Sequence, residues 1–312
     1  MKLPPMQPNR REFLIATALF APLQRLRAAA TPNIPFSTTP RDRLAVASWS
    51  FRDHLDLPEN RAKKTHRDLI ALKDFAAMVA ERYKIHNVEL LGQHLPATTP
   101  EYLKELRAAV QRAGSHVVNV PAGGDASLYD PDARKRAAAV DDGKKWIDVA
   151  VALDSPSVRL NIAGAKGVKP DVQLTAEGLA KIAQYGASKN VVVNLENDDP
   201  DTEDAFFIVK VIDRVNSPWL RALPDFCNSM LKGDPKFNYD AVQAMFQRAY
   251  NIAHLKDSEV DNGKVFRVDL AKTFAIAKAS GFKGYYSVEF EGEGDAYPGV
   301  AKLVDAGLNY LS

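Results

Sequence analysis

The 312-residue chain contains one cysteine, Cys227, so no disulfide can form within it. No glycine-rich phosphate loop follows the first β-rich run, where Ser50-Phe51-Arg52 stands, and this argues against an open dinucleotide-binding sheet. Beyond residue 30, no apolar run is long enough to span a membrane. The chain does contain 46% apolar residues, which is enough to build the core of one large domain.

The formal net charge of +2 hides an uneven distribution of charge. Residues 1–30 hold five basic residues and only one acid, Glu12. The rest of the chain holds 36 basic and 38 acidic residues and is therefore slightly acidic. Because such a domain lacks the basic surface that nucleic acid requires, we expect no nucleic-acid partner.

Residues 1–30 have the three parts of an export signal. Arg10-Arg11 supply the positive start, Leu14–Leu23 the short apolar stretch, and Ala28–Ala30 the small residues of a cleavage site. The paired arginines are typical of a twin-arginine signal, which carries folded proteins to the periplasm, often with a cofactor already bound. An ordinary amphipathic helix or a retained anchor is the alternative, but the apolar stretch is short for a bilayer span. We predict a periplasmic protein without membrane contact once the signal is cleaved.

Residues 31–43 are rich in proline, serine and threonine and are predicted to form a linker. From residue 44 onward, β-rich runs alternate with stretches of helical periodicity. The predicted strands are Leu44–Trp49, Asn87–Leu91, His116–Val120, Ser157–Asn161, Val191–Leu195, Leu220–Leu223, Ile252–Leu255 and Tyr285–Phe290. The predicted helices are Leu69–Tyr83, Glu101–Ala113, Arg134–Leu153, Ala176–Ala187, Asp204–Val215, Tyr239–Tyr250, Leu270–Ala279 and Pro298–Leu308. Eight such pairs predict an α/β protein with parallel strands, a single-domain (β/α)8 TIM barrel over residues 44–312.

Four candidate metal ligands stand at or near the carboxyl ends of the last four predicted strands. They are Glu196, Asp225, His254 and Glu289, separated by 29, 29 and 35 residues. In a (β/α)8 barrel these strand ends converge on one face, so the four side chains can hold a single ion. Three carboxylates and one imidazole suit one divalent metal ion, Mn²⁺ first, with Mg²⁺, Co²⁺ or Zn²⁺ as alternatives.

Each of these ligands also has a structural interpretation when taken alone. Acids after strands often cap the next helix, as Asp198 and Asp199 before Pro200 suggest, and a lone histidine is more often a core residue. Glu289, however, stands between two apolar residues in a run that otherwise indicates a buried strand. A charge buried there needs a partner, which favours the joint metal site.

Several short runs of the chain carry a resemblance to a known family. They are Leu44–Phe51, Val88–Leu90, Glu196-Asn197, Asp225 with Asn228, His254–Asp257 and Ser287–Gly292. With these runs, residues 44–311 resemble the xylose-isomerase-like TIM-barrel family, a sugar isomerase and epimerase group that includes proteins similar to D-tagatose 3-epimerase. The resemblance implies that Glu196 and Glu289 are catalytic as well as metal-binding, whereas Asp225 and His254 mainly hold the metal.

Further polar residues near the predicted strand ends are expected to bind the substrate, with helix caps and salt bridges as the alternative roles. They are Glu89, His94, Arg159, Asn161, Asn228 and Lys256. Trp49 and Phe51 are expected to stack on a sugar ring or to belong to the core. The chain also departs from the resembled family: Asp198 follows Glu196-Asn197 where many relatives have histidine.

The sequence thus predicts an exported metal-dependent sugar isomerase or epimerase. It would act on a small unphosphorylated carbohydrate by enediolate proton transfer, because a cation on adjacent oxygens of a hydroxy-ketone acidifies the C–H beside the carbonyl. A lyase or hydrolase of keto-glycosides with the same metal site is one alternative, and a catalytically silent carbohydrate-binding barrel is another. A DNA-repair endonuclease is disfavoured by the six histidines and the acidic mature chain. The oligomeric state is not predicted.

Overall fold

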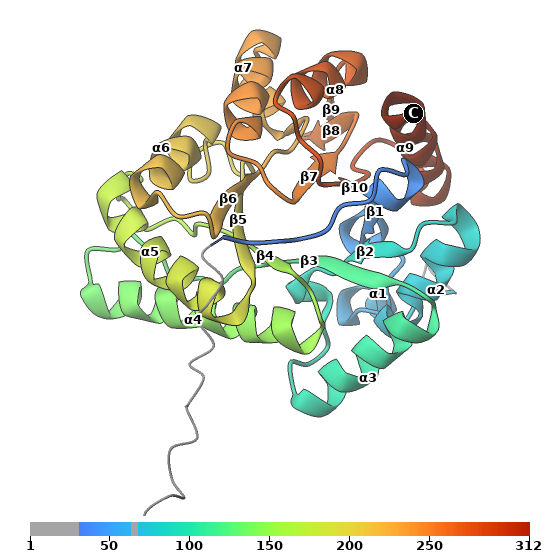
Figure 1. Cartoon of the computed structure of the whole chain (residues 1–312), viewed down its shortest axis with the longest axis horizontal. Coiled ribbons are helices and arrows are strands. Elements are labelled where there is room, and N and C mark those ends of the chain that lie inside the picture. The colour runs from blue at the N-terminus through green and yellow to red at the C-terminus, as the bar shows by residue number, and fades with distance from the viewer. Residues whose placement is uncertain (1–30, 64–67) are drawn as a thin grey trace, which may run out of the picture.

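The computed structural model describes residues 31–63 and 68–312, so the predicted export signal at residues 1–30 lies outside the described residues. Eight parallel strands form one sheet in the order β6-β5-β4-β3-β2-β1-β10-β7. Their bounds are β1 Leu44–Ala47, β2 Asn87–Glu89, β3 His116–Ala122, β4 Ser157–Leu160, β5 Val192–Glu196, β6 Leu220–Leu223, β7 Ile252–Leu255 and β10 Tyr285–Val288. A bridge between Asp225 and His254 links the two ends of the sheet and almost closes it (Figure 1). The prediction of a single-domain (β/α)8 barrel is confirmed.

Helices follow the barrel strands and surround the sheet (Figure 1). Their bounds are α2 Leu72–Tyr83, α3 Pro100–Arg112, α4 Ala133–Ala152, α5 Val172–Lys189, α6 Ala205–Val215, α7 Pro235–Phe246, α8 Leu270–Ala279 and α9 Ala296–Leu311. Two of them begin four residues earlier than predicted because aspartates cap them. The Leu174 N–H donates to Asp171 at 2.8 Å, and the Lys236 N–H donates to Asp234 at 2.8 Å.

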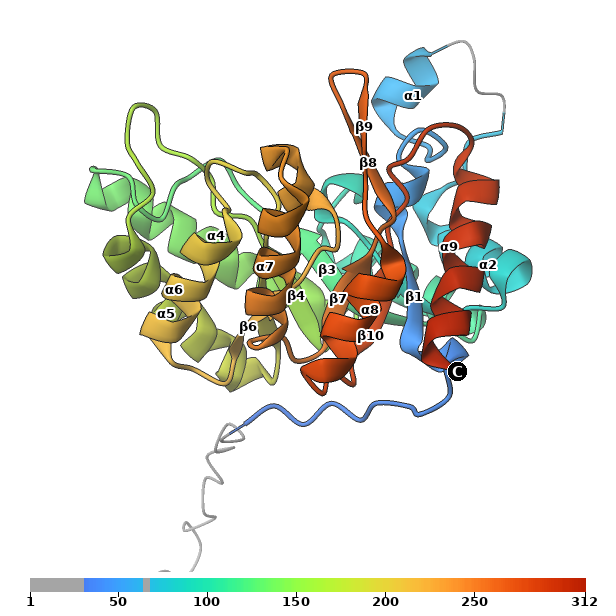
Figure 2. The same cartoon turned by 90° about the horizontal axis from the view of Figure 1, so that it is seen from above.

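Four short elements, a 3-10 helix, an α-helix and two strands, depart from the predicted pattern. A 3-10 helix, Ser48–Phe51, directly follows β1, so the strand predicted to reach Trp49 ends earlier, at Ala47. A short helix, α1 (Pro58–Ala62), follows it. Strands β8 (Ser258–Asp261) and β9 (Lys264–Arg267) form an antiparallel hairpin. This hairpin and α1 stand above the same end of the barrel (Figure 2).

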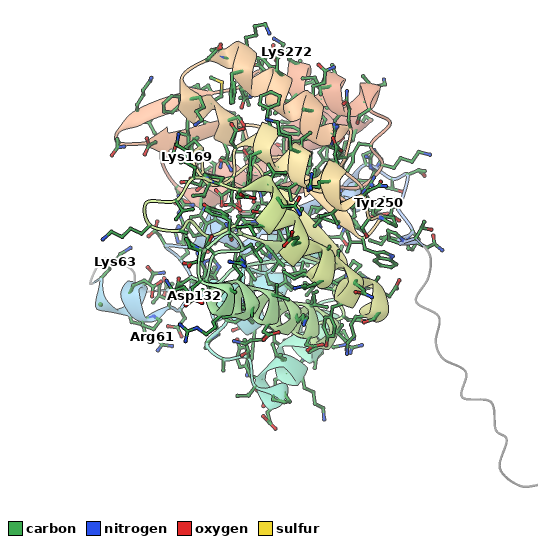
Figure 3. The ribbon with its side chains drawn as sticks, turned by 90° about the vertical axis from the view of Figure 1, so that its left-hand side faces the viewer. Arg61, Lys63, Asp132, Lys169, Tyr250 and Lys272 are labelled. Carbon is green, nitrogen blue, oxygen red and sulfur yellow. The ribbon has the colours of Figure 1, made fainter. Side chains whose placement is uncertain are left out.

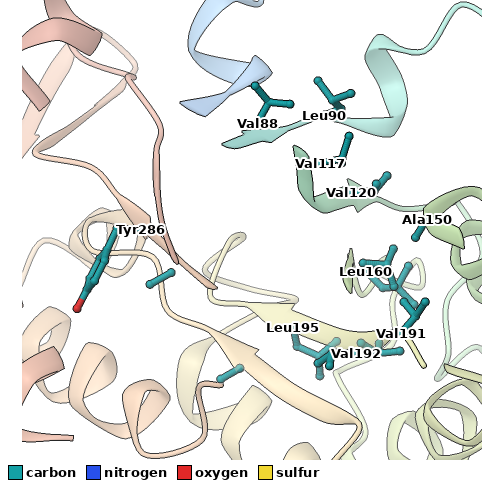
Figure 4. Packing of buried hydrophobic residues seen from close by; sticks show 14 of the residues in the cluster. Val88, Leu90, Val117, Val120, Ala150, Leu160, Val191, Val192, Leu195 and Tyr286 are labelled. Atoms are coloured by element: carbon teal, nitrogen blue, oxygen red, sulfur yellow. The ribbon is translucent and has the colours of Figure 1, made fainter. Parts of the chain in front are cut away.

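The main core lies between the sheet and the helices. Side chains that point outward from the strands, such as Val88 and Leu195, are fully buried there and pack with helix residues such as Ala150 (Figure 4). The alternate, inward positions carry polar residues, among them Asn119, Ser157, Asn194 and Ser287, which are also buried. The barrel interior is therefore polar toward the carboxyl ends of the strands, where the candidate site lies.

Residues 31–43, predicted as a linker, pack across the amino-terminal end of the barrel (Figure 2). The Phe36 ring meets the rings of Tyr250 and Tyr285 edge to face, with centroids 5.6 and 5.7 Å away. Tyr250 and Arg61, which belongs to α1, lie at opposite ends of the molecule (Figure 3). Within the described ranges, no helix has the length and apolar character needed to cross a membrane.

Candidate metal centre

The four predicted ligands lie together at the carboxyl ends of neighbouring strands. Glu196 is the last residue of β5, Asp225 follows β6, His254 lies in β7 and Glu289 directly follows β10. One ligand atom from each lies within 4.8 Å of the others, and all four residues are buried. His254 Nδ1 is 2.8 Å from Glu196 Oε1, 3.2 Å from Glu289 Oε2 and 3.8 Å from Asp225 Oδ2. The nitrogen that faces the carboxylates is therefore Nδ1.

A tight turn after β6 fixes the Asp225 carboxylate. Its Oδ1 accepts hydrogen bonds from the backbone N–H groups of Cys227 at 2.7 Å and Asn228 at 2.6 Å. The Asn197 side chain accepts from the Asp225 N–H at 2.9 Å and holds the turn against β5. Asp225 Oδ2 has no hydrogen-bond partner although the residue is fully buried. Such an oxygen is costly to bury alone, and a hard divalent cation at the cluster would satisfy it.

The other side of the His254 ring is held by Glu89. His254 Nε2 lies 3.0 Å from Glu89 Oε2, and the Asn119 amide donates to Glu89 Oε1 at 2.7 Å. Metal-binding histidines commonly donate their second N–H to a carboxylate in this way, which leaves the first nitrogen free to bind the ion. Glu89 is fully buried and does not line the cavity described below. The predicted contact between Glu89 and the substrate conflicts with this placement.

Negative charge dominates the cluster and shifts the pKa values of its members. Burial opposes a charge on His254, but the facing carboxylates, Glu196 first, hold its pKa well above 6.5. Burial alone would raise the pKa of Glu196, yet Arg159 and His254 lower it to about 2. Burial raises the pKa of Asp225 to about 7, with a contribution from the nearby Glu196 charge, and burial also raises the pKa of Glu289. A divalent cation would offset this excess of carboxylates.

Arg159 and Asn161 lie beside the cluster at the end of β4. Arg159 Nη2 is 2.6 Å from Glu196 Oε2 and 3.3 Å from Asp198 Oδ2. The Asn161 amide donates to Asp198 Oδ2 and to Glu203 Oε2, both at 3.1 Å. Both predicted substrate residues line the cavity, although the Arg159 charge is already paired.

Asp198 and Glu203 belong to the site in a way that the sequence did not reveal. The sequence predicts Asp198 as a helix cap, but α6 is capped by Asp204, which accepts from the N–H groups of the first turn. Asp198 lines the cavity instead. Burial, together with the Asp198 carboxylate, raises the pKa of Glu203 to about 8.

Lys256 is enclosed by polar side chains. Its ammonium donates to Asn228 Oδ1 at 2.6 Å, lies 2.5 Å from Glu259 Oε2 and also contacts Glu291. Lys256 is 1% exposed and does not line the cavity, so a predicted substrate contact conflicts with its placement. Asn228, in contrast, does line the cavity, as does Glu291. Glu291 was missed, although it follows Glu289 at the two-residue period of a strand.

A cavity of about 370 Å³ opens above the cluster. Glu196 and Glu289 line it, whereas Asp225 and His254 lie behind them. Trp49 lines it too, and its Nε1 donates to Glu291.

Besides Glu89 and Lys256, two more residues predicted near the sugar, His94 and Phe51, lie outside this lining. His94 lies behind Trp49, stacked on its ring at 6.0 Å, with Nδ1 2.9 Å from Ser48 Oγ. Burial and the Arg52 charge lower the pKa of His94 to about 4, so it is neutral there. A direct substrate contact by His94 therefore conflicts with the structure. Phe51 is fully buried and belongs to the core.

A family model described as xylose isomerase-like TIM barrel matches residues 78–311. A search of curated protein sequences finds no match.

Several solved structures share the fold. A D-allulose 3-epimerase from Methylomonas sp., in complex with D-allulose, is 14% identical with a TM-score of 0.66 over 88% of this chain and 98% of that chain. A 3-keto-D-glucoside 4-epimerase from E. coli is 15% identical, with a TM-score of 0.59 over 86% and 98%. A probable 3-DHS dehydratase from Bacillus anthracis is 15% identical, with a TM-score of 0.60 over 85% and 98%. At these identities the likeness concerns the fold alone.

Proposed function

The chain belongs to the xylose isomerase-like TIM-barrel family, and from this premise we propose that it is an exported metal-dependent sugar isomerase or epimerase. The observation that carries the proposal is the convergence of three carboxylates and one imidazole within 4.8 Å beside a cavity. The residues that would hold the ion are Glu196, Asp225, His254 and Glu289. A divalent ion held by these residues, Mn²⁺ above all, would supply the Lewis acidity that acidifies the C–H beside the carbonyl of a hydroxy-ketone.

Glu196 and Glu289 are the proposed proton carriers. They line the cavity, whereas Asp225 and His254 do not, so they are the members of the cluster that reach a bound sugar. They come from β5 and from the end of β10, two strands that are separated by β6 and β7 around the barrel. One carboxylate takes the proton beside the carbonyl, and the other returns a proton to the opposite face or to the neighbouring carbon. The first outcome is epimerisation and the second is isomerisation.

The charge of the cavity supports a carbohydrate without phosphate. Among the described residues that line it, Arg159 is the one cation, and it already lies 2.6 Å from Glu196. Asp125, Asp198 and Glu291 add negative charge to the lining of the same cavity. A phosphate or carboxylate on the substrate would meet this negative charge without a free cation to pair with. A small uncharged sugar avoids this repulsion.

The proposal is tested by hydrogen exchange with solvent. The Mn²⁺-loaded protein is incubated in D₂O with a panel of free ketoses, aldoses and keto-glycosides, and deuterium entry beside the carbonyl is followed by NMR. We expect exchange with at least one sugar, accompanied by an epimer or isomer. Release of an aglycone together with exchange would instead indicate the lyase reaction. A fully loaded protein that exchanges no hydrogen in any sugar would contradict the proposal.

Two variants assign the proton carriers. We expect Glu196→Gln and Glu289→Gln each to slow exchange by about 100-fold or more, which is the usual contribution of a general acid or base. Glu293→Gln is the matched control, because the Glu293 side chain is 68% exposed and does not line the cavity. Metal content is measured for each variant, so that loss of the ion is separated from loss of proton transfer. Unchanged exchange in both cavity variants would exclude the assigned roles.

We also propose that residues 1–30 direct export by the twin-arginine route. The support is the paired Arg10-Arg11 before a short apolar stretch and small residues. Residues 31–43 lie at the barrel end opposite the β8–β9 hairpin, so the chain enters the fold away from the cavity (Figure 2). Replacing both arginines by lysine should keep the protein in the cytoplasmic fraction of fractionated cells. Equal periplasmic amounts of variant and wild type would contradict this route.

A further inference from the structure

The cavity extends from the metal cluster to the opposite side of the barrel mouth. The apolar part of this far wall is formed by Leu91, Gly92, Pro121, Ala122, Gly123 and Trp146, and the polar residues Gln93 and Asp125 on the same two loops border it. They stand at the ends of β2 and β3 and on α4, which packs against β3 (Figure 1). In the order of the sheet, β2 and β3 lie across the barrel from β6 and β7. Asp225 follows β6 and His254 lies in β7, so the far wall faces these two ligands. A ligand that fills the cavity therefore spans the mouth of the barrel.

The volume of the cavity exceeds the needs of one sugar ring. A hexose displaces on the order of six water molecules, or roughly 180 Å³ at about 30 Å³ per water. The cavity holds about 370 Å³, close to twice this volume. One ring at the metal cluster would leave the far wall facing water.

Trp146 gives the far wall the character of a sugar-binding surface. Its six-membered ring lies directly over Gly92, where an added Cβ would stand 2.6 Å from Cη2 and 2.7 Å from Cζ3. Only a residue without a Cβ leaves room for the indole there. The ring is half-buried and lines the cavity, beside the buried apolar residues Leu91 and Ala122. Aromatic rings bordered by apolar residues bind the C–H faces of sugars. None of the residues that line this wall is a cation, and the Lys145 ammonium lies outside the lining, 5.6 Å from the centroid of the Trp146 ring.

We infer that the far wall binds a second ring, so that the substrate is a glycoside or disaccharide and not a free monosaccharide. This inference rests on the proposed function, because it places the reacting ring at Glu196 and Glu289. The second ring then packs against Trp146 and is uncharged. Trp49, in the 3-10 helix after β1, lines the cavity as well, but its ring already stacks on His94 and lies 4.8 Å from the Arg52 guanidinium, so Trp146 is the ring assigned to the second sugar.

Binding tests the second ring independently of the reaction. The Mn²⁺-loaded protein is titrated in a calorimeter with glucose, with methyl glucoside, and with maltose, cellobiose, sucrose and trehalose, each also in its 3-keto form. We expect at least one disaccharide to bind about tenfold more tightly than the monosaccharide of the same oxidation state. Disaccharides that all bind no more tightly than the monosaccharides would overturn the inference.

Two substitutions at one position locate the second ring. Trp146→Leu should remove the disaccharide advantage and change the affinity for the monosaccharide by less than about twofold. Trp146→Phe keeps an aromatic face and loses no hydrogen bond, because Trp146 Nε1 has no partner, so it should keep most of the advantage. Thermal unfolding of both variants checks that they are folded. Equal losses of affinity for both ligands in Trp146→Leu would overturn the assignment.

The outcomes separate this inference from the proposed function. A disaccharide advantage that depends on Trp146, without solvent exchange in any sugar, would support the second ring and reject the isomerase or epimerase. Solvent exchange with free sugars, without any disaccharide advantage, would support the reaction and reject the second ring.

Discussion

Replacement of Glu89 by glutamine tests how the barrel interior prepares His254 for a metal ion. Glu89 is fully buried and joins the His254 ring, at 3.0 Å, to the Asn119 amide, at 2.7 Å. In Glu89→Gln, an oxygen can still accept from His254, but the new amide then faces the Asn119 amide, donor against donor. The charge that orients the ring and raises its basicity is also lost.

The expected effect follows from these two changes. Loss of a carboxylate behind a ligating histidine typically weakens metal binding about 10- to 100-fold, or roughly 1.4–2.7 kcal/mol. The opposed amides should cost about 1–3 kcal/mol of unfolding free energy, since one buried donor is left unpaired. Mn²⁺ affinity is measured by titration calorimetry with a competing chelator, and stability by urea unfolding.

A double variant separates the two effects. Adding Asn119→Asp gives the amide of the new glutamine an acceptor. It also keeps an acceptor for the Ser157 hydroxyl, which in the wild type donates to Asn119 Oδ1 at 2.6 Å. Stability should then recover while Mn²⁺ affinity stays low, because the charge no longer touches His254. Glu105→Gln, at an exposed carboxylate, is the control. Wild-type Mn²⁺ affinity in Glu89→Gln would refute the reasoning.

Three further predictions concern other parts of the molecule. Burial raises the folded-state pKa of Glu203 to about 8, so its stabilising contribution is complete below the unfolded value near 4.5 and declines as the pH rises to 8. Urea unfolding of wild type against Glu203→Gln should show that decline, and a pH-independent difference would exclude it. Phe36→Ala removes two edge-to-face ring contacts at the amino-terminal end of the barrel and should lower the free energy of unfolding by about 1–3 kcal/mol. Mn²⁺ affinity should stay unchanged in this variant. Gly92→Ala places a Cβ 2.6 Å from the Trp146 ring and should shift tryptophan fluorescence and cost about 1–3 kcal/mol; an unchanged spectrum and stability would contradict that contact.

The barrel was predictable because its strands and helices repeat with distinct periods. The carboxyl ends of barrel strands converge on one face, which is why residues as distant in sequence as Glu196 and Glu289 could be assigned to one site. The β8–β9 hairpin was missed although Asn262-Gly263 at its tip, both with positive φ, is a typical hairpin turn.

Alternation indicates which way a side chain points but not how deep it lies. Glu89 and Lys256 do point inward, yet both are buried behind other residues, where they hold His254 and Asn228. Trp146 could not be found by these patterns, because it belongs to a helix and reaches the cavity only through the gap over Gly92.

The number of metal ions bound at the cluster tests the central claim most directly. The metal-free protein is titrated with Mn²⁺, and bound ion is counted by calorimetry and by electron paramagnetic resonance. We expect one equivalent in the wild type and an affinity loss of about 100-fold or more in Asp225→Asn, because Asp225 contributes the buried oxygen that lacks a hydrogen-bond donor. Asp240→Asn, at an exposed ion pair, should bind like the wild type. Well under one equivalent in the wild type, or unchanged affinity in Asp225→Asn, would contradict a metal centre at this site.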